Sequence, residues 1–232
     1  MAFTGRRHWG RILYQSAEGE KGREDFAIDV RAGGRTIRSY CEMGEGNLTR
    51  DASWTLDADH RPVEGHVRVV LDGALVGSSW FRCTETDTEC ESLTRLMGRT
   101  SQRLPGRRDY LGLHPLIGDG MIAAARGHDA PGEERMIESV TCSYDINGDS
   151  GLVALPIGIA VTYVGPDSVT VPAGSFDAHH YLLRWQPHWP AAKLWVHGED
   201  MIFLRLSWEI SGLTSELVEF ATNHGPRSPQ FD

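Results

Sequence analysis

The sequence contains no run of about 18 apolar residues, the length that a transmembrane helix needs. Its first residues, MAFTGRRHWGRILYQ, include paired arginines, but no apolar stretch of signal-peptide length follows them. The composition, with 40% hydrophobic and 24% charged residues, is ordinary for a globular domain. We therefore expect a cytoplasmic protein that folds and has no membrane partner.

Cysteines are few and their spacing fits no metal or redox motif. The four of them, Cys41, Cys83, Cys90 and Cys142, are far apart and include no CxxC pair. This spacing argues against a zinc knuckle or a thioredoxin-like site. Reduced cysteine behaves as a small hydrophobic residue, so we expect free buried thiols.

Positive charge is also scarce. The formal net charge is −9 and the pI is about 5.6. The arginine clusters at Arg6 and Arg7 and at Arg103, Arg107 and Arg108 are short and are diluted by acidic residues. A nucleic-acid partner would need a basic face, so none is expected.

Motifs for common cofactors are missing as well. The sequence has no Walker A, G-x-S-x-G, H-E-x-x-H or Rossmann fingerprint. The alternative is a metal site built from His179 or His180 with His188 and His197, because imidazole binds zinc, iron or copper. Ten histidines in a chain of this length make chance clustering easy. We expect neither a metal nor another cofactor.

What the sequence does contain is a series of short alternating apolar and polar runs separated by turn residues. Examples of the turns are Gly33-Gly34, Asp72-Gly73 and Asn147-Gly148. Alternation with period two and glycine-containing turns indicate antiparallel hairpins. We predict one all-β domain over residues 1–232, a lipocalin-like barrel or strongly curled sheet of about ten strands, because closure removes exposed edges.

The middle of the chain departs from this pattern. Residues 93–130 lack clean alternation, contain Pro105 and Pro115, and include one short predicted helix around Gly120 to Arg126. Irregular segments of this length inside compact domains are usually functional, so we predict a capping segment that crosses the sheet. Residues 223–232 are predicted to be a frayed, flexible tail.

Alternation assigns side chains to faces in the stretch HHYLLRW. His180 and Arg184 share one face, whereas His179 and Tyr181 share the other. We predict that His180 and Arg184 look inward. A later strand has an apolar face, and its opposite face mixes aromatic and charged residues, namely Phe203 and Arg205. The same mixture of residue types recurs on other strands. Its further members are Arg38 with Tyr40, His66 with Arg68, Trp80 with Arg82, and Lys193 with Trp195 and His197.

These mixed faces have two interpretations. They line a barrel interior and bind a ligand, since a few polar groups among hydrophobic ones define a binding site. Alternatively they are hydrated, and Arg205 with Glu209 forms a surface pair that contributes little.

A second candidate site is the stretch LGLHPLIGDG, residues 111–120. Pro115 favours an extended His114, and the glycines around Asp119 permit a tight backbone path. If the two side chains meet, Asp119 would fix the tautomer of His114 and make it a better base. The alternative is that Asp119 caps the short helix that follows.

The residues Val171, Pro172, Ala173, Gly174, Phe176 and Asp177 form a V-P-A-G-x-F-D segment. With the strands after it, this segment resembles a largely uncharacterised bacterial family of curled β-sheet proteins. The resemblance covers about a quarter of the chain, residues 169–220, and implies an antiparallel β fold without catalytic content. In overall style the chain also resembles lipocalin-like barrel enzymes of aromatic-compound catabolism, which implies a lyase that releases formaldehyde from lignin-derived aromatic dimers.

The leading hypothesis is a cofactor-independent lyase or isomerase with a cavity for a hydrophobic, aromatic small molecule. His114 or His180 would act as the base, Asp119 would orient it, and Arg184, Lys193 or Arg205 would stabilise an oxyanion. The predicted substrate-binding residues are Tyr40, Trp80, Arg184, Lys193, Trp195, His197 and Phe203. The alternatives are a lipocalin-like carrier that uses the same cavity without turnover, and an interaction module without a deep cavity. Exposed apolar strand faces are compatible with a homodimer.

Overall fold

The computed structural model describes residues 5–224. Of the tail that the sequence predicts to be frayed, residues 225–232 lie outside the described part. Residues 223 and 224 are the last residues of a strand, so the predicted fraying is wrong for these two. None of the helices within residues 5–224 has the length and apolarity that crossing a membrane requires.

Fifteen strands and three short helical segments make up the described chain. The first eight strands are β1 (Arg6–Ser16), β2 (Gly19–Arg31), β3 (Gly34–Met43), β4 (Leu48–Leu56), β5 (Pro62–Leu71), β6 (Ala74–Cys83), β7 (Asp87–Thr94) and β8 (Gly98–Pro105). The other seven are β9 (Tyr110–Gly112), β10 (Glu134–Thr141), β11 (Leu155–Val171), β12 (Gly174–Arg184), β13 (Ala192–His197), β14 (Ile202–Trp208) and β15 (Leu213–His224). The helical segments are η1 (Glu45–Asn47), η2 (Leu116–Asp119) and α1 (Gly120–Arg126).

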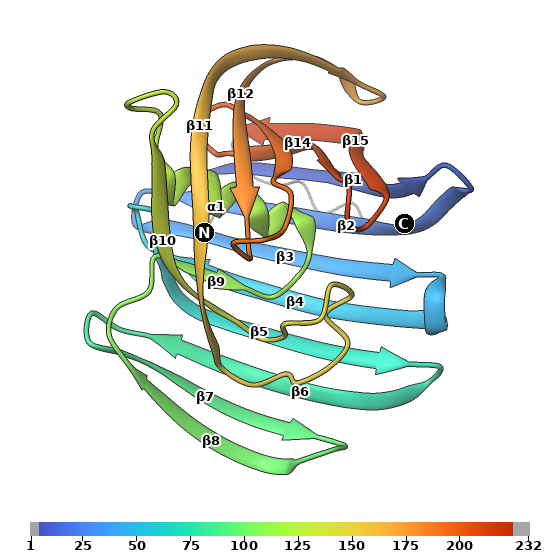
Figure 1. Cartoon of the computed structure of the whole chain (residues 1–232), viewed down its shortest axis with the longest axis vertical. Coiled ribbons are helices and arrows are strands. Elements are labelled where there is room, and N and C mark those ends of the chain that lie inside the picture. Colours follow the sequence, from blue (N-terminus) through green and yellow to red (C-terminus); the bar gives the residue numbers. More distant parts are fainter. Residues whose placement is uncertain (1–4, 225–232) are drawn as a thin grey trace.

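All fifteen strands belong to one sheet, which confirms the predicted all-β, curled antiparallel fold. The order is β8-β7-β6-β5-β4-β3-β2-β1-β15-β14-β13-β12-β11-β10-β9, and only β9 and β10 are parallel (Figure 1). The predicted number of about ten strands is too low. Residues 93–130, predicted to be irregular, contain the end of β7, all of β8 and all of β9, because polar strands such as GRTSQRLP show little apolar alternation.

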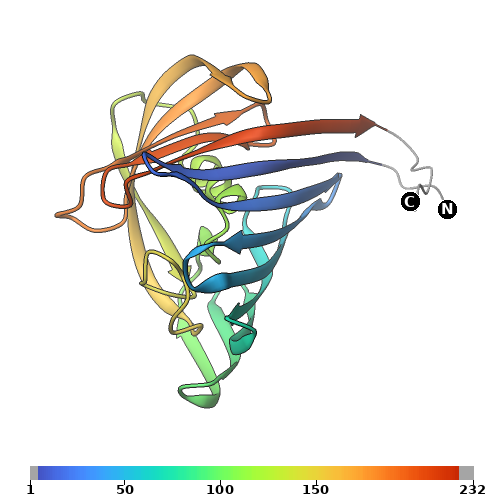
Figure 2. The same cartoon turned by 90° about the vertical axis from the view of Figure 1, so that its right-hand side faces the viewer.

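The sheet curls through most of a turn but is not closed. Strands β8 and β9 are consecutive in the chain yet form its two opposite edges, and only residues 106–109 connect them. Five Cα steps span at most about 18 Å, so the two edges must lie close together. The view in Figure 2 shows this curl, with the β1–β8 meander and the β10–β15 strands facing one another across the helical segment.

The concave side of the sheet is filled by the chain itself. The segment of β9, η2 and α1 lies inside the curl, and Leu111 approaches β5 where Gly65 has no side chain. A Cβ at Gly65 would lie 2.4 Å from a methyl carbon of Leu111. Trp54 donates from Nε1 to the carbonyl oxygen of Leu111 at 2.9 Å. An irregular, partly helical crossing segment is therefore present, but it begins after β8 and not at residue 93, and its side chains form part of the core.

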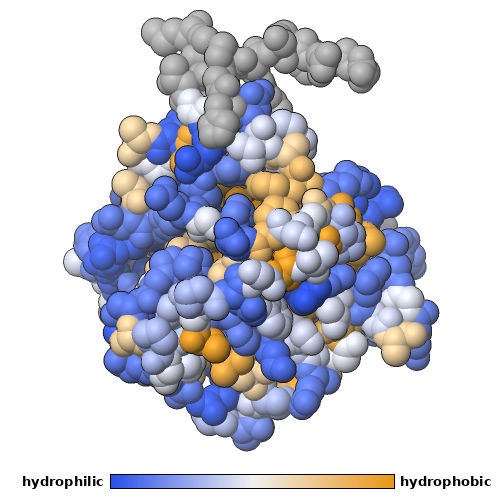
Figure 3. All heavy atoms as spheres, turned by 90° about the horizontal axis from the view of Figure 1, so that it is seen from above, coloured by the Kyte–Doolittle hydropathy of each residue, from blue (hydrophilic) through white to orange (hydrophobic). Residues whose placement is uncertain are grey.

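The convex side carries a ladder of opposite charges. Neighbouring strands place Arg11 opposite Asp25, with 2.7 Å between Nε and Oδ1, and Asp51 opposite Arg68. Cross-strand charge pairs keep this face hydrated. Seen from above, the surface is largely hydrophilic, with apolar atoms gathered near its middle (Figure 3). Edge strand β8 presents Arg99, a cation that discourages pairing with a further strand.

A buried ionic cluster joins segments that are far apart in the sequence. Asp200, in the β13–β14 turn, accepts from His8 Nε2 at 2.8 Å and forms an ion pair with Arg6 at 2.5 Å. Arg35 donates to the Asp200 backbone carbonyl oxygen at 3.2 Å and contacts His60. Burial raises the pKa of Asp200, but the hydrogen bond from His8 and the charges of Arg35 and Arg6 outweigh it and hold this pKa below its usual value. The cluster therefore ties β1, β3 and the β4–β5 turn to the β13–β14 turn.

The contact of α1 with the β13–β14 turn can be tested at Gly120. A Cβ there would lie 2.1 Å from the carbonyl oxygen of Met201. We expect Gly120→Ala to lower the free energy of unfolding by about 1–3 kcal/mol, as overpacking does, although alanine favours helix by about 1 kcal/mol. Urea denaturation checks this, with Gly33→Ala as the control because no atom lies within 4 Å of its added Cβ. Equal stability of the two variants would show that the residues around Gly120 shift to make room for the added methyl group.

Candidate functional site

The interior of the curl is solid, which overturns the expectation of a hollow lumen. Its largest fully buried apolar side chains come from the sheet and from the crossing segment alike. They are Tyr181, Phe81, Phe203, Ile12, Ile28, Ile37, Leu111, Leu113, Ile117, Ile122 and Leu152. The narrow gap between Trp54 and Tyr110 has no room for a water molecule. Within residues 5–224 these side chains fill the centre, so a ligand would bind there only if the crossing segment moved.

The predicted inward orientation of His180 and Arg184 is wrong. Tyr181 and Leu183 are fully buried, so alternation places His180 and Arg184 on the convex side. Arg184 forms an ion pair with Glu134 at 2.6 Å. Alternation along a strand shows which residues share a face. It does not show which face is the inner one when both faces carry apolar residues.

His180 and its neighbours form a stacked group on the convex side. The His180 ring lies parallel to Trp195, with 4.4 Å between centroids, and the guanidinium of Arg205 lies 5.9 Å from the Trp195 ring. Trp195 donates from Nε1 to Asp167 at 2.8 Å. Arg205 donates to Glu216 at 2.7 Å, so its acidic partner is Glu216 and not the expected Glu209.

Most of the other predicted substrate-binding residues also lie on the convex side. These convex-side residues are Tyr40, Trp80, Lys193 and His197. Phe203 is the exception and is fully buried, because a bulge between Trp195 and Val196 interrupts the alternation. The structure therefore does not bring the predicted residues together in one pocket, and their roles in binding stay predictions.

His114 and Asp119 both lie inside the curl, but they have different partners. His114 Nε2 lies 3.2 Å from the Ser143 carbonyl oxygen, and the ring packs against the backbone of Gly148. Burial and then the nearby Arg50 guanidinium lower the pKa of His114 to about 3. Asp119 instead accepts from the Tyr110 hydroxyl at 3.2 Å. Within residues 5–224 no hydrogen bond joins His114 to Asp119, so the predicted pairing is not formed.

Asp119 occupies the residue before α1, yet its side chain makes no capping hydrogen bond, so the capping alternative is wrong. Burial, opposed by the hydrogen bond from Tyr110 and supported by the nearby Glu24, raises the pKa of Asp119 to about 8. Asp119 is therefore largely protonated at neutral pH.

Glu24 fixes the crossing segment to the sheet. Its fully buried carboxyl accepts from Tyr14 at 2.8 Å, from Ser39 at 2.9 Å, and from the backbone N–H groups of Leu116 and Ile117 at 2.7 and 3.2 Å. Burial raises the pKa of Glu24, while these hydrogen bonds oppose the rise. Four donors form hydrogen bonds to the Glu24 carboxyl, and this side chain is fully buried. We therefore assign Glu24 a structural role.

The arrangement best suited to chemistry lies at the rim, where β11 and β12 meet the end of α1. We call His128, Tyr163, His179 and Tyr181 the rim cluster. The Tyr163 hydroxyl lies 2.9 Å from His179 Nδ1, and the Tyr181 hydroxyl lies 2.8 Å from His128 Nδ1. The two imidazole rings are 3.8 Å apart between centroids. Each histidine is thus oriented by a tyrosine.

The hydrogen bonds of Tyr181 define the tautomer of His128. The Tyr181 hydroxyl also donates to the Gly127 carbonyl oxygen at 3.3 Å. Both bonds form at once only if His128 Nδ1–H donates to the hydroxyl oxygen, which leaves the lone pair on Nε2. Partial burial and then the neighbouring His179 lower the pKa of His128, and burial also lowers that of His179. Both imidazoles are therefore neutral at pH 7 and able to accept a proton.

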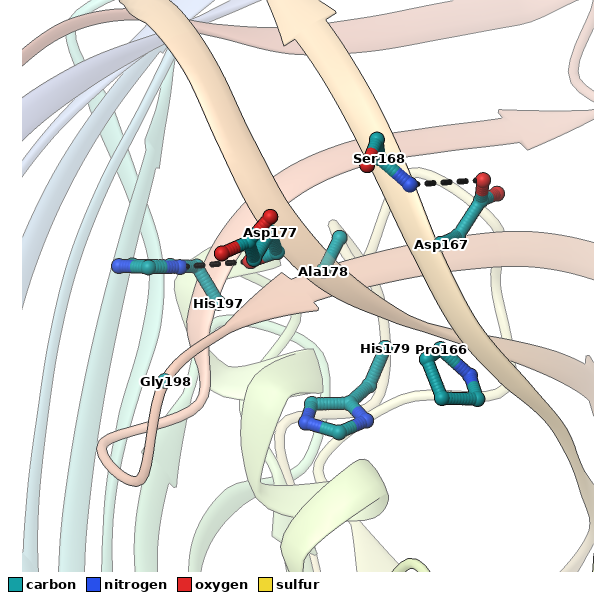
Figure 4. A pocket seen from close by; sticks show the side chains of 8 residues that line it. All are labelled: Pro166, Asp167, Ser168, Asp177, Ala178, His179, His197 and Gly198. Atoms are coloured by element: carbon teal, nitrogen blue, oxygen red, sulfur yellow. Dashed lines mark hydrogen bonds between the residues drawn. The ribbon is translucent and has the colours of Figure 1, made fainter.

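His179 lines an open surface depression of about 600 Å³. Its other walls are Pro166, Asp167, Ser168, Asp177, Ala178, His197 and Gly198. Figure 4 shows the His179 ring directed toward the helical segment, with Asp177 and His197 on one side of the depression and Asp167 and Ser168 on the other. A small molecule in the depression would have the His179 imidazole at one end and carboxylates on two sides.

Sequence analysis missed His128, Tyr163 and His179 as members of one site. It placed His179 correctly on the face of Tyr181 but took that face to be the outer one. The sequence signal for the cluster is that His179 and Tyr181 lie two residues apart and so share one strand face. Each of them pairs with a residue outside this strand, His179 with Tyr163 and Tyr181 with His128. Their approach to His128 depends on the course of the crossing segment, which the sequence does not determine.

No known protein family matches the sequence, and no curated protein matches it. Among solved structures, the chain is similar to a β-barrel-like protein of the domain of unknown function DUF1849 from Brucella abortus. The TM-score is 0.59 at 10% identity, over 96% of this chain and 100% of that one. It is also similar to a DUF1089 family protein from Pseudomonas aeruginosa, with a TM-score of 0.49, 12% identity, and coverage of 80% and 88%. The first similarity supports the curled, barrel-like fold and says nothing about activity. The second is too low to support a conclusion.

The protonation of Asp119 predicts a specific pH dependence of stability. The folded state holds this proton up to about pH 8, whereas an unfolded aspartate loses it near pH 4, so stability falls as pH rises between these values. We expect Asp119→Asn, which keeps the acceptor for Tyr110, to remove this part of the decline. Thermal unfolding between pH 5 and pH 9 measures it, with Glu199→Gln in an exposed turn as the control. Parallel curves for wild type and Asp119→Asn would contradict the assignment.

Proposed function

We propose that the protein binds a small aromatic molecule in the depression beside the rim cluster and acts on it by acid–base chemistry without a cofactor. The observation that carries this proposal is the pair of adjacent, neutral imidazoles, each fixed through Nδ1 by a tyrosine hydroxyl, with one of them lining an open depression. A positioned imidazole with a pKa below neutrality is a suitable general base.

Each residue has a defined part in this proposal. His179 reaches the depression and accepts the proton, and Tyr163 holds its ring through Nδ1. His128 lies against His179 with its ring tilted. Burial and then the nearby His197 lower the pKa of His179, which preserves its ability to act as a base. His197, on another wall of the depression, can return a proton to the product.

The reaction we propose is an elimination that releases formaldehyde from an aromatic compound bearing a hydroxymethyl group. His179 removes the hydroxyl proton, the bond between the hydroxymethyl carbon and its neighbour breaks, and formaldehyde leaves. The electron pair stays on the neighbouring carbon, is delocalised into the aromatic system, and takes up a proton from an imidazolium. Every proton and electron pair is balanced without a cofactor.

A carrier without turnover is the second candidate. It is favoured by the lack of any lysine or arginine among the residues that line the depression, because an oxyanion formed there has no fixed cation to stabilise it. We place either activity in the cytoplasm, since the four cysteines are free and buried, as expected of a reducing compartment. Whether the protein forms a homodimer stays a prediction.

The adjacent histidines offer a matched test, because His179 lines the depression and His180 stacks on the convex side. Lignin-derived aromatic dimers with a hydroxymethyl group are the probe, and trapped formaldehyde is the readout. We expect His179→Gln to lower the rate on the order of 10²-fold while calorimetry shows unchanged binding, and His180→Gln to keep full activity.

The other outcomes decide between the alternatives. Wild-type binding without formaldehyde or any other product would support the carrier. Activity that survives His179→Gln but not His180→Gln would show that the active site lies on the convex side, at His180. Absence of binding by the wild type would refute both enzyme and carrier at this depression.

A further inference from the structure

The hairpin of β7 and β8 ends in an unusual group of exposed apolar side chains. Leu96 is 91% exposed, Leu93 57% and Met97 45%. The flanking Ser92 and Thr94 are buried on the concave side, so Leu93 points to the convex side, and Leu96 and Met97 occupy the turn. Large apolar residues exposed together usually mark an interaction site.

The shape and position of this tip limit what can bind it. The β7–β8 hairpin forms the edge of the sheet at the lower end of the long axis in Figure 1, and the backbone N–H of Arg95 in its turn donates to the Val76 carbonyl oxygen of β6. A stable protein interface buries about 800 Å² on each partner, which three apolar side chains on a convex tip cannot supply. A lipid bilayer needs no complementary surface and can take up a few exposed apolar side chains at a turn, so it suits this tip better.

The charge on the tip has the sign that an anionic bilayer attracts. Arg95 lies between Leu93 and Leu96, is exposed, and has no acidic partner among residues 5–224. The Arg99 side chain is 85% exposed and meets Glu91 only at 4.0 Å. Two arginines beside exposed leucine and methionine are notable in a chain whose net charge is −9.

We propose that the β7–β8 tip docks on an anionic lipid bilayer, with Leu93, Leu96 and Met97 entering the interface and Arg95 and Arg99 contacting the headgroups. Sequence analysis expected no membrane partner because no long apolar run is present, but peripheral docking needs no such run. The proposal does not depend on the function of the rim cluster.

Co-sedimentation of the full chain with vesicles tests the proposal. The vesicles contain phosphatidylcholine alone or phosphatidylcholine with phosphatidylglycerol. We expect binding to the anionic vesicles only, weakened at least about tenfold by Leu96→Asp because one buried leucine is lost, and about fivefold by Arg95→Gln. The matched control is Met136→Asp on β10, which introduces the same charge at another exposed apolar residue and should bind like wild type.

Three results would overturn it. These are the absence of wild-type binding to anionic vesicles, equal binding to both kinds of vesicle, and unchanged binding by Leu96→Asp. A dimer in size-exclusion chromatography that Leu96→Asp dissolves, without vesicle binding, would assign the tip to a second copy of the chain instead. Circular dichroism confirms that each variant folds, which the exposure of these side chains favours.

Discussion

A single curved sheet must cover its concave side, and in this protein the cover is a segment of the same chain held by one carboxyl group. Glu24 accepts hydrogen bonds from β1, β3 and the backbone at the start of η2, so the sheet and the crossing segment meet at this side chain. Without it, two backbone N–H groups would be buried without partners, which is costly. The course of β9, η2 and α1 through the curl therefore depends on this interaction.

The filled interior determines where chemistry can take place. Buried ionisable groups lose their charge or become locked in hydrogen bonds, as the shifted pKa values of His114 and Asp119 show. Groups on the convex side are paired with neighbouring strands and stay hydrated. At the rim, two adjacent imidazoles are oriented by tyrosine partners and one of them is open to a small molecule, which is why the proposed function rests on His128 and His179.

Much of the architecture could be predicted from the sequence, and specific residues show why the rest could not. Turn residues such as Gly33-Gly34 and Asp72-Gly73 mark real hairpins, and the short helix at Gly120 to Arg126 is where the pattern puts it. The grouping of His180 with Arg184 is also correct, but their direction is not, because it depends on which way the sheet curls. The approach of His128 to His179 joins residues 51 positions apart through the packing of an irregular segment, and no local pattern encodes it.

The two strands at the middle of the sheet have a consequence for how the protein folds. Strand β1 pairs with β15 along its whole length, from Arg6 opposite His224 to Gln15 opposite Thr214. In the sequence, these paired residues are about as far apart as the described chain allows. Contacts between such distant positions slow folding because a very long loop must close. During synthesis β1 waits for its neighbour until nearly all of the described chain has been made. Its open edge is then a site where a nascent chain could aggregate, and a chaperone that covers β1 would act at the most vulnerable point of assembly.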